Sequence, residues 1–261
     1  MSSRCATSGC PSSGRLRLIA GLLALGACTP APLEVIALDP ATLDDGLVAH
    51  WTFDDGSGAV ALDHSGNGYD GQITGGSWIS DGRFGGALHL DEGSFVSVAD
   101  FPDATQSWSV SAWVRLTDAT PTTEVFKTVI STEMEASGGW EMNIDRTMAQ
   151  PGAHFGYWEG TAVAEYYRIT CYCMEFGAWT PIVASVDADA GTLSLYVGSV
   201  LGASAPIAQT ILPGSATLYM GKWTGDGRLL VGDLDDILIY RRALFPAEIA
   251  ELSSFSPPDV H

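Results

Sequence analysis

Short runs rich in branched and aromatic residues recur along this 261-residue chain, and the clearest of them alternates hydrophobic and polar residues with the two-residue period of β-strands. Residues 108–116 show it best: every second residue there is apolar and those between are mostly polar, as in a half-buried strand. Further strands are expected at residues 47–53, 125–131, 140–144, 153–158, 163–170, 179–187, 192–198, 217–221 and 229–240. So many short strands separated by polar turns predict an all-β fold, an antiparallel sandwich of two sheets.

The segment Leu229–Leu252 is expected to end the fold with a strand and a short helix. Its first half is rich in branched and aromatic residues, and Pro246 suits the first turn of the helix. Strict alternation puts Asp235 and Asp236 on opposite faces of the strand, where a buried carboxylate needs a hydrogen-bond donor or a metal ion. The apolar neighbours on the same face are Ile237 and Ile239 for Asp235, and Leu238 and Tyr240 for Asp236.

Residues 1–28 have the parts of an export signal: a start with three arginines, a short apolar run, and small residues leading to Cys28. The apolar run is too short for a stable membrane span. Residues 25–28 (LGAC) resemble the lipobox of bacterial lipoproteins, in which the cysteine becomes the lipidated first residue. An ordinary secretory signal, cleaved after small residues, is the alternative.

The signal, the prolines and the predicted strands together divide the chain into four expected segments. Residues 1–28 are a lipoprotein signal peptide, 29–45 a flexible tether with three prolines, 46–254 the folded domain, and 255–261 a C-terminal tail. A lipid on Cys28 would hold the domain at a membrane of the bacterial cell envelope, outside the cytoplasm.

The composition narrows the partners of this domain. There are 12 Lys and Arg against 31 Asp and Glu, a net charge of −19. Such a surface repels nucleic acid and anionic membrane surfaces, so membrane contact is expected only through the lipid anchor. Many carboxylates also supply oxygen ligands for hard cations.

Three motifs resemble the laminin-G-like, concanavalin-A-like jelly-roll domains of bacterial surface proteins. In the glycine-rich segment 63–71 the matching residues are Asp63, Ser65, Gly66, Asn67, Gly68 and Gly71. Residues 82–98 match the family's hairpin, and residues 232–249 match its closing strand and helix. The resemblance covers about residues 46–252 and implies a jelly-roll sandwich with a short C-terminal helix.

The resemblance also implies a structural calcium ion. Its ligands would be Asp63, Asn67 and Asp235, oxygen donors in motifs that the family often uses for a cation. The alternative is that Asp63 caps the glycine turn and Asp235 accepts backbone N–H bonds.

Aromatic residues gather in the middle third of the chain. Trp140, Tyr157, Trp158 and Tyr166 are candidate ligand-binding residues, because aromatic rings stack on sugar faces. Equally, such residues fill the core of a sandwich.

A catalytic site for glycan hydrolysis needs two carboxylates. The candidates are Glu133 with Glu135, or Glu141 and Asp145 flanking Asn143. The E-x-D-x-x-E arrangement of related glycan hydrolases is absent, and these residues are better explained as a solvated strand edge. Cys171 and Cys173 are left as two thiols or a local disulfide.

These observations predict a non-catalytic cell-surface lipoprotein that binds a carbohydrate or another surface macromolecule. One alternative is a divergent glycan hydrolase or lyase on the same fold. Another is a structural or adhesive surface protein without a small ligand.

Overall fold

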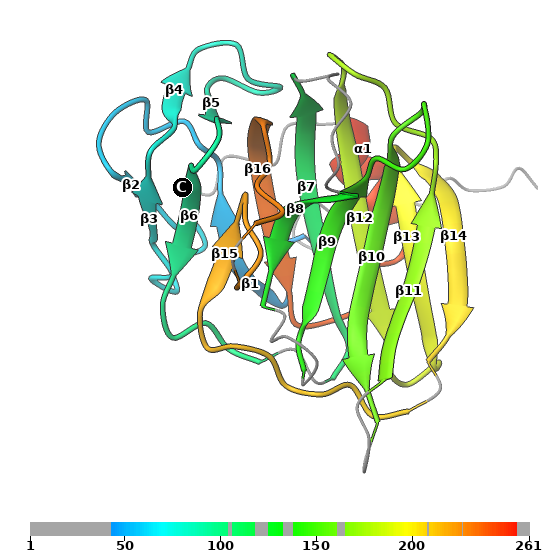
Figure 1. The fold of residues 1–261 in the computed structure, drawn as a ribbon. Coiled ribbons are helices and arrows are strands. Elements are labelled where there is room, and N and C mark those ends of the chain that lie inside the picture. Colours follow the sequence, from blue (N-terminus) through cyan, green and yellow to red (C-terminus); the bar gives the residue numbers. More distant parts are fainter. Residues whose placement is uncertain are drawn as a thin grey trace, which may run out of the picture. The chain divides into compact units, whose positions relative to one another are not determined.

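A computed structural model of the chain describes residues 43–103, 106–117, 125–132, 138–160, 165–207, 209–225 and 227–254. These residues form two antiparallel sheets of eight strands each and one C-terminal helix (Figure 1). The predicted all-β jelly-roll sandwich with a short terminal helix is thereby confirmed.

The first sheet has the strand order β14-β13-β12-β7-β16-β5-β4, and β1 also pairs with β16. Its strands are β1 (Leu47–Trp51), β4 (Ser77–Ile79), β5 (Ala87–Leu90), β7 (Trp108–Leu116), β12 (Trp179–Asp187), β13 (Thr192–Val197), β14 (Val200–Pro206) and β16 (Gly232–Tyr240).

The second sheet has the order β11-β10-β9-β8-β15-β6-β3-β2. Its strands are β2 (Val60–Ala61), β3 (Gly71–Thr74), β6 (Phe95–Val98), β8 (Phe126–Ser131), β9 (Trp140–Asp145), β10 (Gly152–Glu159), β11 (Glu165–Cys171) and β15 (Leu218–Met220). Figure 1 shows β8–β11 in front of β7, β12 and β13 of the first sheet.

The core lies between the two sheets and takes every second residue of each long strand. Its centre is aromatic: the rings of Trp108 and Trp140 lie 4.5 Å apart, and those of Trp108 and Phe155 5.5 Å apart. All three side chains are buried. Burying a large apolar side chain contributes about 1.5–3 kcal/mol, so these strands are fixed in register mainly by their inward faces.

The helix α1 (Pro246–Ser254) covers the outer face of the first sheet and lies behind β7 and β12 in Figure 1. Ile249 and Leu252 pack there against Val183 of β12 and Leu238 of β16. No helix in the described residues is long and apolar enough to cross a bilayer.

Strand β16 contains a bulge that strict alternation of the sequence does not predict. Leu234 and Ile237 both face the core although they are three residues apart, and the register against β7 shifts between Asp235 and Leu238. Asp236 adopts a left-handed backbone conformation, φ 41°. Strict alternation, which put Asp235 on one face with Ile237, is therefore wrong here, because the extra residue resets the pleat.

Candidate functional site

The outer face of the second sheet carries an unusual set of buried polar side chains. Glu141, Asn143 and Asp145 alternate along β9 with core residues, and His154 lies beside them on β10. Each is at most 6% exposed. The sequence-based interpretation of β9 as a solvated strand edge is wrong, because β9 is an interior strand between β8 and β10.

Strand register places two of these residues, Asn143 and His154, in one row with two threonines. Thr128 of β8 lies opposite Asn143, Asn143 opposite His154, and His154 opposite Thr170 of β11. Because residues opposite one another in adjacent strands share a face, the row runs straight across the sheet.

A chain of hydrogen bonds links the neighbouring residues. The Tyr166 hydroxyl contacts both Oε1 of Glu141 and Nε2 of His154, the latter at 3.2 Å. Nδ1 of His154 lies 3.0 Å from the Thr170 hydroxyl, and Nη1 of Arg228 donates to Oε2 of Glu141 at 2.7 Å.

One arrangement of protons satisfies all of these hydrogen bonds. Tyr166 has a single proton, and the ionised Glu141 is purely an acceptor, so the Tyr166 hydroxyl donates to Glu141. The Tyr166 oxygen then accepts the Nε2–H of His154, and Nδ1 of His154 accepts the Thr170 proton. This assigns a neutral His154 protonated at Nε2.

The environment of His154 agrees with that tautomer. Burial lowers the pKa of His154 to about 4, helped by the positive charges of Arg168 and Arg228 and opposed by the charge of Asp145. The imidazole is thus uncharged at neutral pH.

Two glycines of β10 leave room for tyrosine side chains to lie across the outer face of the sheet. A Cβ on Gly156 would overlap the Tyr166 hydroxyl that reaches Glu141, and a Cβ on Gly152 would contact the ring of Tyr172. The Tyr172 hydroxyl in turn donates to Oδ2 of Asp145 at 2.7 Å. The same arrangement therefore occurs twice: a tyrosine lies over a glycine of β10, and its hydroxyl donates a hydrogen bond to an acid of β9.

Asp145 is held as a carboxylate by its donors. Burial alone would raise the pKa of Asp145, but hydrogen bonds from the Thr147 hydroxyl and amide and from Tyr172 outweigh it, and the pKa lies below its usual value.

Arg228 comes from a loop far along the chain. It lies between β15 and β16, has a left-handed backbone conformation with φ 52°, and its carbonyl accepts the Thr128 amide at 2.7 Å. Its guanidinium stacks 4.6 Å from the Trp223 ring. A side-chain-bearing residue at positive φ costs free energy, and strain of this kind often marks a functional site.

Two polar groups in the row are not satisfied. Both side-chain polar atoms of Asn143 and the hydroxyl of Thr128 are buried without a hydrogen-bond partner in the described part of the chain. An unmet buried polar group costs about 1–3 kcal/mol, so this row lowers the stability of the fold.

The predicted aromatic site divides between the two faces of the second sheet. Trp140 and Tyr157 point into the core and are at most 2% exposed, so they do not reach a ligand on the outer face. Trp158 and Tyr166 lie opposite each other on the outer face, partly exposed, with ring centroids 5.3 Å apart. Alternation separates Tyr157 from Trp158 because they are consecutive residues of one strand.

The predicted calcium ligands lie in separate hydrogen-bond networks. The Asp63 carboxylate accepts from the His50, Ser65 and Tyr69 amides and from the Ser65 hydroxyl, at 2.9–3.0 Å. Burial would raise the pKa of Asp63, but these bonds prevail and lower it. They occupy about four lone-pair positions, all that a carboxylate offers, so Asp63 fits a turn cap.

The other two candidates also have partners. The Asn67 amide nitrogen donates to the carbonyls of Leu47 and Val48. Oδ2 of Asp235 accepts the Arg83 amide at 2.6 Å and the Phe84 amide at 3.0 Å, while its Oδ1 is buried without a partner. No group of three His, Cys, Asp or Glu among the described residues is arranged to hold a metal. The calcium ion stays a prediction.

Three other predicted residues lie outside the described part of the chain: Glu133, Glu135 and the lipidation site Cys28. Cys171 and Cys173 form a disulfide, one of the two alternatives left open by the sequence.

Sequence reasoning missed His154, Arg228 and the two glycines. The polar alternation of β9 and β10 could have indicated His154, since it continues the pattern of Glu141, Asn143 and Asp145. No local signal points to Arg228, which is 87 residues from its partner Glu141.

Comparison with known proteins supports the fold. The family described as the concanavalin A-like lectin/glucanases superfamily matches residues 90–250. Among curated proteins, none matches the chain by sequence.

Solved structures with the same fold include domain 4 of AbnA, a GH43 extracellular arabinanase from Geobacillus stearothermophilus, in complex with arabinotriose. It is 23% identical with a TM-score of 0.60, over 80% of this chain and 98% of that one. The binding domain of botulinum neurotoxin serotype G is 17% identical with a TM-score of 0.60, over 79% of this chain. The binding domain of Paraclostridial Mosquitocidal Protein 1 is 18% identical with a TM-score of 0.62, over 81% of this chain. The chain spans about half of each toxin chain, 50% and 52%.

Proposed function

Because the chain belongs to the concanavalin A-like lectin/glucanases superfamily, we propose that it is a non-catalytic carbohydrate-binding module held at the bacterial cell surface. The glycan lies on the outer face of the second sheet, over β9, β10 and β11. Trp158 and Tyr166 contact its sugar rings, above the buried polar row.

The observation that carries this proposal is the pair of partly exposed aromatic rings, Trp158 and Tyr166, on that face. The Tyr166 hydroxyl belongs to a polar network with Glu141 and His154. Sugars present hydroxyl groups and apolar ring faces together, so aromatic rings beside polar groups suit a saccharide better than a purely apolar ligand.

The hydrogen-bond chain orients Tyr166 for that task. Its hydroxyl is fixed by Glu141 and His154, and Glu141 is fixed by Arg228. A binding residue held in one rotamer loses little conformational entropy when the ligand arrives.

The neighbours of the same fold make carbohydrate the first class to test. One of them is bound to arabinotriose, and others are binding domains of botulinum neurotoxins, one of them described as receptor-binding. Lipidation at Cys28 would place the domain outside the cytoplasm, where glycans and surface proteins are the available partners.

The test is an oligosaccharide array that includes arabinotriose, followed by calorimetry on each ligand found. We expect Trp158→Ala to weaken binding by about tenfold or more, as for a central aromatic contact. Phe245→Ala is the control, because that ring is 68% exposed beside the helix of the other sheet. Equal losses in both variants, or no glycan bound at all, would contradict the proposal; capture of a protein partner alone would favour an adhesive role.

A second candidate function is an enzyme that cleaves glycans, favoured by one observation: the Tyr166 hydroxyl is shared by an acid and a histidine. Against it, both oxygens of Glu141 already accept hydrogen bonds. Glu141 and Asp145 are also four residues apart in β9, about 13 Å at roughly 3.3 Å per residue. The carboxylates of glycosidases lie roughly 5–9.5 Å apart.

Release of reducing ends or unsaturated products from polysaccharides would decide between the two. We expect none from the wild-type chain. Turnover that disappears in Glu141→Gln would establish the enzyme instead.

A further inference from the structure

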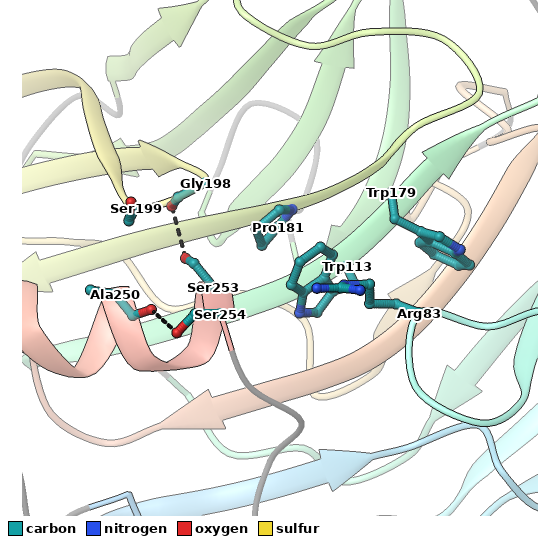
Figure 2. A pocket seen from close by; sticks show the side chains of 9 residues that line it. All are labelled: Arg83, Trp113, Trp179, Pro181, Gly198, Ser199, Ala250, Ser253 and Ser254. Carbon is teal, nitrogen blue, oxygen red and sulfur yellow. Dashed lines mark hydrogen bonds between the residues drawn. The ribbon is translucent and has the colours of Figure 1, made fainter.

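A pocket lies on the opposite side of the sandwich from the aromatic face, between the outer face of the first sheet and the C-terminal end of α1 (Figure 2). Its volume is about 670 Å³, within the range of small-ligand sites. Arg83, Trp113, Trp179, Pro181, Ser199 and Ser253 line it.

The Arg83 guanidinium stacks on two aromatic rings at this pocket. Its carbon lies 4.7 Å above the Trp113 ring and 4.8 Å from the Phe84 ring, and Figure 2 shows it in front of the indole. The Arg83 amide donates to the buried Asp235 carboxylate at 2.6 Å, which holds the loop against the sheet. An arginine whose backbone is held by a hydrogen bond and whose side chain stacks on aromatic rings needs less reorganisation to bind a ligand than a free side chain.

The charge of Arg83 is not neutralised by a neighbour. No carboxylate lies within ion-pair distance of it in the described part of the chain, although the protein carries 31 acidic residues. Arg115, the other arginine of this face, pairs with Asp81 and Asp233. Arg83 therefore presents an available positive charge beside the pocket.

The remaining walls suit a sugar. The Trp179 ring is partly exposed, and its Nε1 is buried without an acceptor among the described residues. The single proton of the Ser253 hydroxyl lies within reach of the Ile249 carbonyl at 2.7 Å and the Gly198 carbonyl at 2.9 Å, and the hydroxyl oxygen remains able to accept. The Ser199 residue is exposed at the rim.

We propose that this pocket is a second ligand site that takes a carboxylate-bearing sugar, such as a uronic acid. Arg83 pairs with the carboxylate, Trp179 contacts the ring face, and the serines meet its hydroxyl groups. A guanidinium favours a planar carboxylate because it offers two parallel donors. The inference does not rest on the proposed function, because the two sites lie on opposite sheets.

The test titrates the full chain with methyl β-D-glucuronide and, separately, with the uncharged methyl β-D-glucoside, by calorimetry at low and high salt. We expect the glucuronide to bind more tightly than the glucoside, and added salt to weaken it. Arg83→Gln should weaken glucuronide binding by about tenfold or more, because a charge-assisted pair is lost. Arg83→Lys should lose less, since the charge remains.

Arg241→Gln is the matched control, because Arg241 is an exposed arginine that lines neither proposed site. Arg168→Gln probes the outer face of the second sheet instead. Binding in the control is compared first, and glucuronide binding should be unchanged in it. The proposal is overturned if glucuronide and glucoside bind equally, if neither binds, or if Arg168→Gln weakens binding while Arg83→Gln does not. The last result would assign the sugar to the outer face of the second sheet. Equal melting temperatures of the variants check that each is folded.

Discussion

Asp235 shows at the residue scale how burial can dominate the pKa of a carboxyl group. Burial, and then the charge of Asp236, raises the pKa of Asp235 to about 8, although the Arg83 and Phe84 amides act in the other direction. The unfolded chain has the ordinary pKa of 3.8. The folded protein therefore keeps a proton that the unfolded chain loses, so the stabilisation is present below about pH 4 and is lost as the pH rises towards 8.

We expect the melting temperature of the wild-type chain to fall between pH 5 and pH 8 by more than that of Asp235→Asn, because Asn cannot ionise. Scanning calorimetry across this range measures it. Asp189→Asn, at an exposed turn, is the control and should follow the wild-type curve. Parallel curves for wild type and Asp235→Asn would show that Asp235 is ionised throughout.

Gly156 and Gly152 offer a prediction at the scale of the strand. Gly156→Ala places a methyl group where the Tyr166 hydroxyl lies, whereas Gly152→Ala meets only Tyr172 and the Cys171 carbonyl. Both should destabilise the fold by about 1–3 kcal/mol through overpacking. Only Gly156→Ala should also reduce glycan binding at equal folded fraction, because Tyr166 is displaced from Glu141. Calorimetry of both variants with the same glycan distinguishes them, and equal binding would remove Tyr166 from the site.

The helix α1 depends on one acid. Glu248 is 2% exposed; it accepts two hydrogen bonds from the Arg242 guanidinium, at 2.8 and 2.6 Å, and one from the Phe245 amide at 2.8 Å. The pair raises the pKa of Arg242.

We expect Glu248→Gln to lower the free energy of unfolding by about 1–3 kcal/mol, because hydrogen bonds to a charged group are lost. Urea denaturation measures it. Glu251→Gln on the same helix should change the value by less than about 0.5 kcal/mol. A similar loss in both variants would mean that the helix depends on net charge and not on this contact.

The anchor is a prediction for the whole molecule. Cys28→Ala should abolish membrane fractionation and labelling with a radioactive fatty acid, because the lipid has no attachment site. The melting temperature of the domain should stay the same. Cys10→Ala is the control and should remain membrane-bound. A Cys28→Ala chain that is still labelled would rule out the lipobox.

Calcium is a second prediction at this scale. If Asp63, Asn67 and Asp235 hold the ion, a chelator should lower the melting temperature of the calcium-loaded chain, and Asp235→Asn should abolish that response. An unchanged midpoint would leave Asp63 as a turn cap whose lone pairs are already occupied.

The sequence by itself determined the class of fold, most of the strands and the closing helix, because alternation reports which residues share a face. Alternation does not show whether the outward face of a strand is exposed to solvent, and the buried polar face of β9 is therefore not predictable from it. Composition alone also does not separate Trp140, which faces the core, from Trp158, which faces outward. The sequence could not place the bulge at Asp236, which depends on partners in other strands. Only the tertiary structure brought Arg228 to Glu141 and Arg83 over Trp113, since such contacts join distant segments whose approach is set by strand register and packing.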